Sequence, residues 1–170
     1  MTTSSLDLRT DAASGRQVLT FDLAGETYGV DILRVQEIRG WSPVTRIPKT
    51  PKHVLGVLNL RGSIVPIVDL RVRFGLERAE FTPLTVIIVL SIKTETGRRE
   101  FGLVVDAVSD VVDLGPEAMR ETPSLGSKTS VEVIESLATV EDRMLILLNV
   151  DQLASLDLGG DAVAELKGAA

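Results

Sequence analysis

YGVDILRVQEI, residues 28–38, aligns without a gap on FGLVVDAVSDV, residues 101–111. Both segments begin with an aromatic residue and a glycine, apolar residues recur at matching positions, and Glu37 matches Asp110. A second pair follows in the same order, with IVPIVDL, residues 64–70, matching MLILLNV, residues 144–150. The second half has the longer spacing, and its extra length falls near residues 122–130, a Ser/Thr/Gly stretch. The chain is therefore predicted to contain two copies of one small unit of about 70 residues.

Around these segments, short β-branched runs alternate with turn signals, which is typical of a barrel or a sandwich. Strands are expected over residues 17–24, 27–32, 54–60, 64–70, 84–92, 100–105 and 144–150. Short helices are expected around residues 32–38, 69–74 and 116–119. A unit this small has a small core, and closing its strands into a barrel would remove exposed edges. We predict an all-β fold of two packed five-stranded barrels, about residues 16–83 and 84–155, with a flexible leader (1–15) and tail (156–170).

Composition excludes several classes of protein. The chain has no cysteine, one histidine and a net charge of −6, so disulfides and thiolate metal sites are ruled out. Nucleic acid is an unexpected partner for an acidic chain with 4% aromatic residues. One basic cluster is interpreted as a solvated loop, and it comprises Arg46, Lys49, Lys52 and Arg61. The polar N-terminal residues lack an apolar signal core and no run is long enough for a membrane helix, so a cytoplasmic location is expected.

No set of residues supplies a full catalytic site. His53 is the single histidine and more plausibly has a structural role than a ligand role. The stretch GSKT, residues 126–129, lacks the glycines and the preceding strand of a phosphate-binding loop. Asp106 and Asp110 are interpreted as capping or turn residues and not as an acid/base pair. A non-catalytic binding protein is therefore expected, with no cofactor and no metal.

A groove between two barrels would suit a partner helix. Its candidate apolar residues, each of which could equally belong to the core, are Val35, Ile38, Val86, Ile87 and Val111. Arg61 lies at a glycine-flanked hairpin turn, and its guanidinium can make a bidentate bond to a carboxylate. That carboxylate could be Glu37 of the same chain, one on a partner, or both.

These residues lie in motifs that resemble the CheW family of bacterial chemotaxis coupling proteins. The motifs are YGVDILRVQEIRG (28–40), GVLNLRG (56–62), VPIVDLR (65–71), GLVVDAVSDV (102–111) and DRMLILL (142–148). They occur in the family's order and cover roughly residues 16–155. Two departures, Trp41 where tyrosine is common and Glu141 where glycine is common, put only local turn geometry in doubt.

The resemblance implies two SH3-like barrels and an adaptor that links chemoreceptors to the histidine kinase CheA. The receptor's helical tip would dock at the groove, and the regulatory domain of CheA would pair with barrel ends. The protein would not insert into the membrane but would be recruited to receptor arrays. The implied partner-binding residues are Val35, Glu37, Gly56, Arg61, Val86, Ile87, Gly102 and Val111.

Two alternatives stay open from the sequence. A small enzyme or nucleotide-binding domain would depend on His53 or Asp106, although the other groups that such chemistry needs are missing. The same adaptor could also serve a pathway other than flagellar motility, such as surface motility.

Overall fold

The computed structural model describes residues 16–76, 81–94, 97–120 and 133–157. The strands are β1 (Arg16–Leu23), β2 (Glu26–Asp31), β3 (Val35–Gly40), β4 (Val54–Leu60), β5 (Ser63–Asp69), β6 (Val86–Thr94), β7 (Gly97–Val105), β8 (Ala107–Leu114), β9 (Met119–Arg120), β10 (Ile134–Val140) and β11 (Arg143–Leu148). The helices are α2 (Leu70–Arg73), α4 (Val150–Asp157) and the single-turn 3-10 helices η1 (Ile32–Arg34) and η2 (Pro116–Ala118). The expected leader and the residues of the expected insertion lie outside the described residues.

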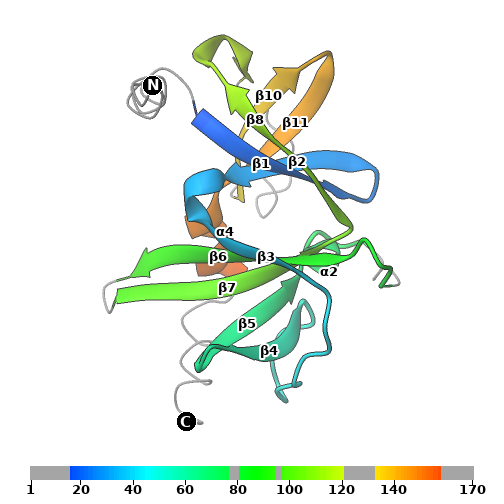
Figure 1. The fold of residues 1–170 in the computed structure, drawn as a ribbon, viewed down its shortest axis with the longest axis vertical. Coiled ribbons are helices and arrows are strands. Elements are labelled where there is room, and N and C mark those ends of the chain that lie inside the picture. Colours follow the sequence, from blue (N-terminus) through cyan, green and yellow to red (C-terminus); the bar gives the residue numbers. More distant parts are fainter. Residues whose placement is uncertain (1–15, 77–80, 95–96, 121–132, 158–170) are drawn as a thin grey trace, which may run out of the picture.

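The strands form two sheets, shown one above the other in Figure 1. The six-stranded sheet has the order β8-β1-β2-β11-β10-β9, and the five-stranded sheet has the order β3-β6-β7-β5-β4. Their strands carry the Val, Ile and Leu runs that pack well on pleated surfaces. The prediction of an all-β fold with few short helices is confirmed.

The division of the chain between the two sheets differs from the expected boundary between residues 83 and 84. Hairpin β1–β2 belongs to the first repeat but lies in the six-stranded sheet beside β8–β11, and hairpin β6–β7 of the second repeat lies beside β3–β5. The barrel boundaries 16–83 and 84–155 are therefore wrong. Parallel pairing causes the exchange, because β2 pairs with β11 and β5 pairs with β7. Each repeat gives its first hairpin to the sheet built mainly from the other repeat.

Matching glycines stand at both parallel contacts. Gly29 is opposite Leu147, and Gly102 is opposite Ile67, which are equivalent positions in the two repeats. A Cβ on Gly29 would lie 2.4 Å from Cγ1 of Val18, so the neighbouring strand leaves no room for a side chain. The glycine of the aromatic–glycine pair that reveals the repeat is thus required by close packing against the neighbouring strands.

One apolar core joins the sheets, and each sheet also has a smaller one. The joining core draws buried side chains from both sheets, including Phe21, Leu148, Ile88 and Phe101. Leu60, Val65, Ile67, Ile87, Val89 and Val104 form the second core, inside the five-stranded sheet. Val18, Leu114, Ala138, Leu145 and Leu147 form the third, inside the six-stranded sheet. The exchanged hairpins therefore share one continuous apolar interior.

Some of the short helices and strands predicted from the sequence agree with the structure and others do not. The short helices expected near residues 69–74 and 116–119 correspond to α2 and η2, whereas the helix expected over residues 32–38 is only η1 followed by β3. From Val35 to Gly40 the chain pairs with β6 instead, with a register shift between Val35 and Glu37. Strands β8 and β10 were not predicted. Helix α4 extends two residues into the expected tail, and residues 158–170 lie outside the described residues.

We expect Gly102→Ala to lower the free energy of unfolding by about 1–3 kcal/mol. The new methyl group would lie 2.7 Å from Cγ2 of Ile87 and 2.8 Å from Cδ1 of Ile67, and the β-branched Ile87 cannot easily turn away. Urea unfolding measures the change. The matched control is Gly40→Ala on β3, where a Cβ meets nothing within 4 Å and the effect should stay within about 0.5 kcal/mol. Equal effects at both positions would contradict the close-packing explanation.

Candidate functional site

The β4–β5 turn presents Arg61 to solvent. Arg61 and Gly62 both have positive φ, 53° and 88°, as a two-residue turn matched to the twist of its strands requires. The side-chain oxygen of Asn59 accepts a hydrogen bond of 2.9 Å from the Gly62 N–H and fixes the turn. Arg61 thereby projects from the end of the hairpin with 68% of its side chain exposed.

Arg61 forms an ion pair with Glu37. Its Nη1 atom lies 2.7 Å from Oε1 of Glu37, and Nη1 of Arg39 lies 3.7 Å from Oε2 of the same carboxylate. The hydrogen bond to Glu37, with its charge, raises the pKa of the Arg61 guanidinium. The intramolecular alternative for the Arg61 carboxylate partner is therefore present in the structure, and the exposure of Arg61 leaves its other donors accessible to a second protein.

This pair also closes the five-stranded sheet. Glu37 lies on β3 and Arg61 beside β4, and these strands occupy opposite edges of the sheet. The two edges must approach each other for the ion pair to form. The backbone of Thr45 pairs with Val57 of β4 through hydrogen bonds of 2.9 and 2.8 Å, which brings the chain after β3 to the same edge. The sheet therefore curls round on itself, as in a small barrel.

The apolar residues of the predicted set are exposed to different degrees. Val35 and Val86 are half-buried and pack against the core that joins the sheets, whereas Ile38 is 43% exposed. Gly40 of β3 stands opposite Val86, so these residues share the β3–β6 edge of the sheet. Val111 is 43% exposed, but it lies on β8 of the six-stranded sheet. Seven of the eight predicted partner-binding residues thus lie in the five-stranded sheet, and Val111 does not.

Three of the predicted residues are buried and have packing roles. Ile87 has no exposed surface, and Gly102 lies against it at the β5–β7 contact. Gly56 is also buried, and a Cβ there would lie 2.2 Å from the carbonyl oxygen of Thr45. Direct contact between these three residues and a partner is contradicted by their burial. They shape the surface that Glu37 and Arg61 present.

In the part of the chain that the structure describes, the equivalent place in the six-stranded sheet has no counterpart of the Arg61–Glu37 ion pair. There the β10–β11 turn has Glu141 and Asp142 at positive φ, 50° and 66°, and Glu141 matches Arg61 in the repeat. Asp110, which matches Glu37, instead accepts a hydrogen bond from the N–H of Val111. Arg143 donates to the Thr27 hydroxyl over 2.9 Å. Two acids at equivalent positions cannot form an ion pair, so the Arg-centred surface belongs to the five-stranded sheet alone.

Sequence reasoning missed several exposed apolar residues. The most exposed are Leu33, Leu84, Ile64 and Met144. Ile64 and Met144 are 59% and 52% exposed and match each other in the repeat, at the starts of β5 and β11. The alignment of the two segments had already paired them, but apolar residues in strands are usually core residues and gave no sign of exposure.

Within the described residues, nothing forms a catalytic or metal site. Those residues contain no group of three His, Asp or Glu side chains that could hold a metal ion. Asp106 makes structural bonds with Arg71 and with the Ala24 N–H. None of the helices in the described ranges is both long enough and apolar enough to cross a bilayer.

We expect the pKa of His53 to lie below its ordinary value of 6.5, because burial disfavours the charged form and the charge of Arg73 adds to this effect. The folded state then binds the proton less readily than the unfolded chain, so stability falls as the pH drops below about 6.5 towards the folded pKa. Proton NMR of this single histidine measures the pKa directly. Arg73→Gln should raise it, and a pKa at or above 6.5 in the parent protein would contradict the burial argument.

The amino-acid sequence of this chain is similar to those of known proteins. The model of the CheW-like domain family matches residues 17–157. The chain is 46% identical over 141 residues to the chemotaxis protein CheW of Klebsiella aerogenes, covering 83% of this chain and 82% of the relative. Its identity to the CheW of Rhizobium meliloti is 39%, covering 82% of this chain and 87% of that one.

A solved structure agrees with the fold. The scaffolding protein TtCheW from Thermoanaerobacter tengcongensis superimposes with a TM-score of 0.71 at 31% identity, covering 79% of this chain and 89% of that one. The family match spans nearly all the described residues, and two relatives exceed 30% identity over most of their own length. The chain therefore belongs to the CheW family of chemotaxis scaffolding and coupling proteins, a non-catalytic adaptor family.

Proposed function

We propose that this protein couples the cytoplasmic tip of a chemoreceptor to the regulatory domain of the histidine kinase CheA. The observation that supports this most directly is the Arg61–Glu37 pair, which holds an exposed guanidinium at the β4–β5 turn of the five-stranded sheet. Arginine is one of the residue types that are enriched among the few side chains that dominate binding energy in protein interfaces. The protein would act in the cytoplasm, recruited to membrane-associated receptor arrays.

The exposed and half-buried residues of the predicted set are the proposed contacts, namely Val35, Glu37, Arg61, Val86 and Val111. Gly56, Ile87 and Gly102 support them from within the five-stranded sheet. Val111 adds a contact from β8, so a partner that touches it together with Arg61 would bridge both sheets. A helical receptor tip seated between the two sheets would meet this requirement.

Signal transfer in this proposal needs no reacting group on the adaptor. Receptor and kinase bind different faces, and the signal is a difference in contact free energy between the kinase-on and kinase-off assemblies. A rigid adaptor transmits such a difference better than a pliable one, because little of it is lost in deforming the adaptor. The continuous core that joins the two sheets gives the protein this rigidity.

We expect Arg61→Glu to weaken assembly with receptor and kinase fragments by at least about tenfold. The substitution places an acid beside Glu37, so the surface loses its cation and gains repulsion. Pull-down with purified fragments, together with circular dichroism of the free variant, provides the measurement. The matched control is Arg143→Glu on the β10–β11 turn, which makes the same change of charge at an exposed arginine in the other sheet.

Comparison of Arg61→Glu with Arg143→Glu shows which sheet carries the contact. Weakened binding of Arg61→Glu with near-normal binding of Arg143→Glu supports the assignment of the contact to the five-stranded sheet. Normal binding of a folded Arg61→Glu variant would show that the proposed surface is wrong. Separate assays with each fragment show whether receptor or kinase meets Arg61.

We expect no saturable micromolar binding of ATP, because the described residues offer no phosphate-binding loop and Asp106 is engaged in structural bonds. Isothermal titration calorimetry with ATP and magnesium tests this. Saturable binding that is lost in a His53→Ala variant would favour the nucleotide-binding alternative over the adaptor.

A further inference from the structure

Within the described residues, the chain passes between the two sheets at two short connections, and each carries a charged residue. The first connection is η1, which links β2 of the six-stranded sheet to β3 of the five-stranded sheet and contains Arg34. The second lies between β7 and β8, where Asp106 is the only residue between the two strands. Both residues bind elements of both sheets.

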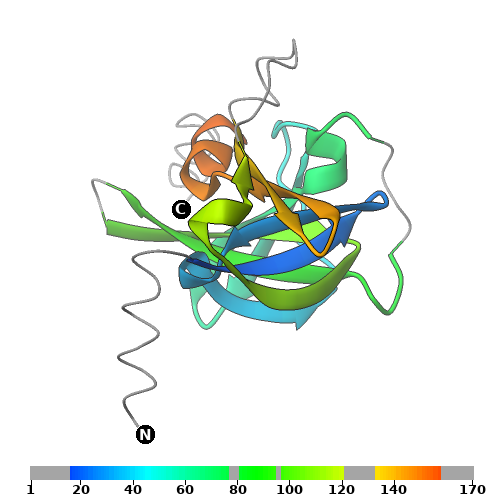
Figure 2. The same cartoon turned by 90° about the horizontal axis from the view of Figure 1, so that it is seen from above.

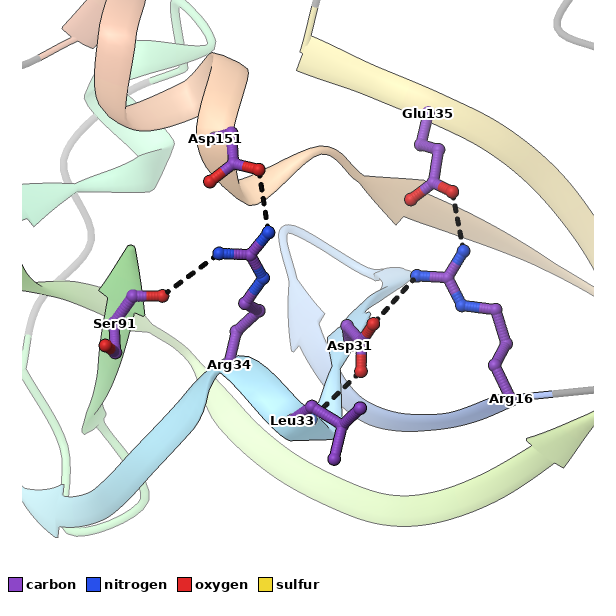
Figure 3. A network of polar contacts seen from close by, with 7 residues as sticks. All are labelled: Arg16, Asp31, Leu33, Arg34, Ser91, Glu135 and Asp151. Atoms are coloured by element: carbon purple, nitrogen blue, oxygen red, sulfur yellow. Dashed lines mark hydrogen bonds and ion pairs between the residues drawn. The ribbon is translucent and has the colours of Figure 1, made fainter. Parts of the chain in front are cut away.

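Arg34 connects the sheets through its guanidinium. Its Nη2 atom lies 2.7 Å from Oδ2 of Asp151 in α4, the helix that follows β11 of the six-stranded sheet. Its Nη1 atom donates over 3.5 Å to the carbonyl oxygen of Ser91 on β6 of the five-stranded sheet. Figure 3 shows Arg34 between these two acceptors. We call Arg34 with Asp151 the first latch.

Asp106 makes the corresponding connection with opposite charge. Its Oδ2 atom accepts a bond of 2.8 Å from Nη1 of Arg71 in α2, the helix that follows β5 of the five-stranded sheet. The same oxygen accepts the N–H of Ala24, at the β1–β2 turn of the six-stranded sheet, over 2.9 Å. The backbone N–H of Asp106 donates to the carbonyl of Asp22 on β1. We call Asp106 with Arg71 the second latch.

The latches occupy matching places in the two repeats. Continuing the alignment of residues 64–70 with 144–150 by one position places Arg71 on Asp151, each in the first turn of its helix. The partner lies on the connection in both cases, but the cation and the anion have changed places. Helix α4 lies to the left of helix α2 and apart from it in both views (Figures 1 and 2). The two ion pairs therefore restrain the sheets at two separate places.

We propose that the two latches fix the angle between the sheets. The core that joins them is apolar, and apolar contact opposes separation but is non-directional. Charge-assisted hydrogen bonds depend on geometry, so they can select one angle among several that would keep the core buried. Partial burial protects the second latch from screening by salt more than the first, since the side chains of Arg71 and Asp106 are only 22% and 33% exposed.

The distance between the sheets tests this directly. The chain has no cysteine, so cysteines introduced as Ile64→Cys and Met144→Cys, one at an exposed position of each sheet, accept spin labels specifically. Pulsed electron–electron double resonance then gives the distribution of inter-sheet distances. In the labelled background, Arg34→Gln with Asp106→Asn should broaden this distribution or shift its maximum, and each single variant should do so to a smaller extent.

The matched control is Arg120→Gln. Arg120 lies on β9 at the edge of the six-stranded sheet and donates to the carbonyl oxygens of Glu117 and Met119, so its loss should leave the inter-sheet distances unchanged. An unchanged distribution in the folded double latch variant would overturn the proposal, as would equal broadening by Arg120→Gln. If the double variant does not fold, the two single variants decide the result in the same way. The measurement uses the free protein, so it stands apart from the proposed receptor and kinase contacts.

Discussion

The parallel pairing of β2 with β11 and of β5 with β7 determines how the two repeats combine into sheets. Each pairing places a hairpin of one repeat in the sheet of the other, and each includes a glycine whose neighbours leave no room for a side chain. These glycines are Gly29 and Gly102, at equivalent positions in the two repeats. The exchange leaves the sheets with a shared apolar core, which explains how two units too small for large cores of their own form one stable body.

The exchange of hairpins between the sheets also determines where polar contacts must hold the chain, namely at the connections between the sheets. Because the described chain crosses between sheets only through η1 and at Asp106, the geometry of the whole molecule depends on these two short connections. Asp31 caps η1 by accepting the N–H of Leu33 over 2.9 Å, so the first connection has a fixed shape. Asp106 binds the β1–β2 turn and so gives the second connection a fixed place. Both aspartates therefore have a structural role at the connections.

The repeat, the strand-rich fold and the Arg61–Glu37 pair could be predicted from the sequence, because each depends on local patterns or on matching segments. The allocation of strands to sheets could not, since a repeat shows that two units exist but not whether their hairpins are exchanged. The sequence predicts a helix over residues 32–38, and pairing with β6 overrides that local expectation from Val35 onward. The burial of Ile87 and Gly102 likewise depends on the β5–β7 contact, which joins distant parts of the chain.

The repeat also explains why one sheet carries the arginine-centred surface. Both turns after the matching strands use the same backbone, with φ of 53° at Arg61 and 50° at Glu141, so the fold fixes the position and leaves the side chain free to differ. Arg61 pairs with Glu37, while Glu141 would face Asp110 with like charge. The two similar sheets therefore present opposite charge at equivalent turns, and surfaces of opposite charge select partners of different charge. Divergence of one turn residue is thus enough to give the two copies of a duplicated unit different surfaces.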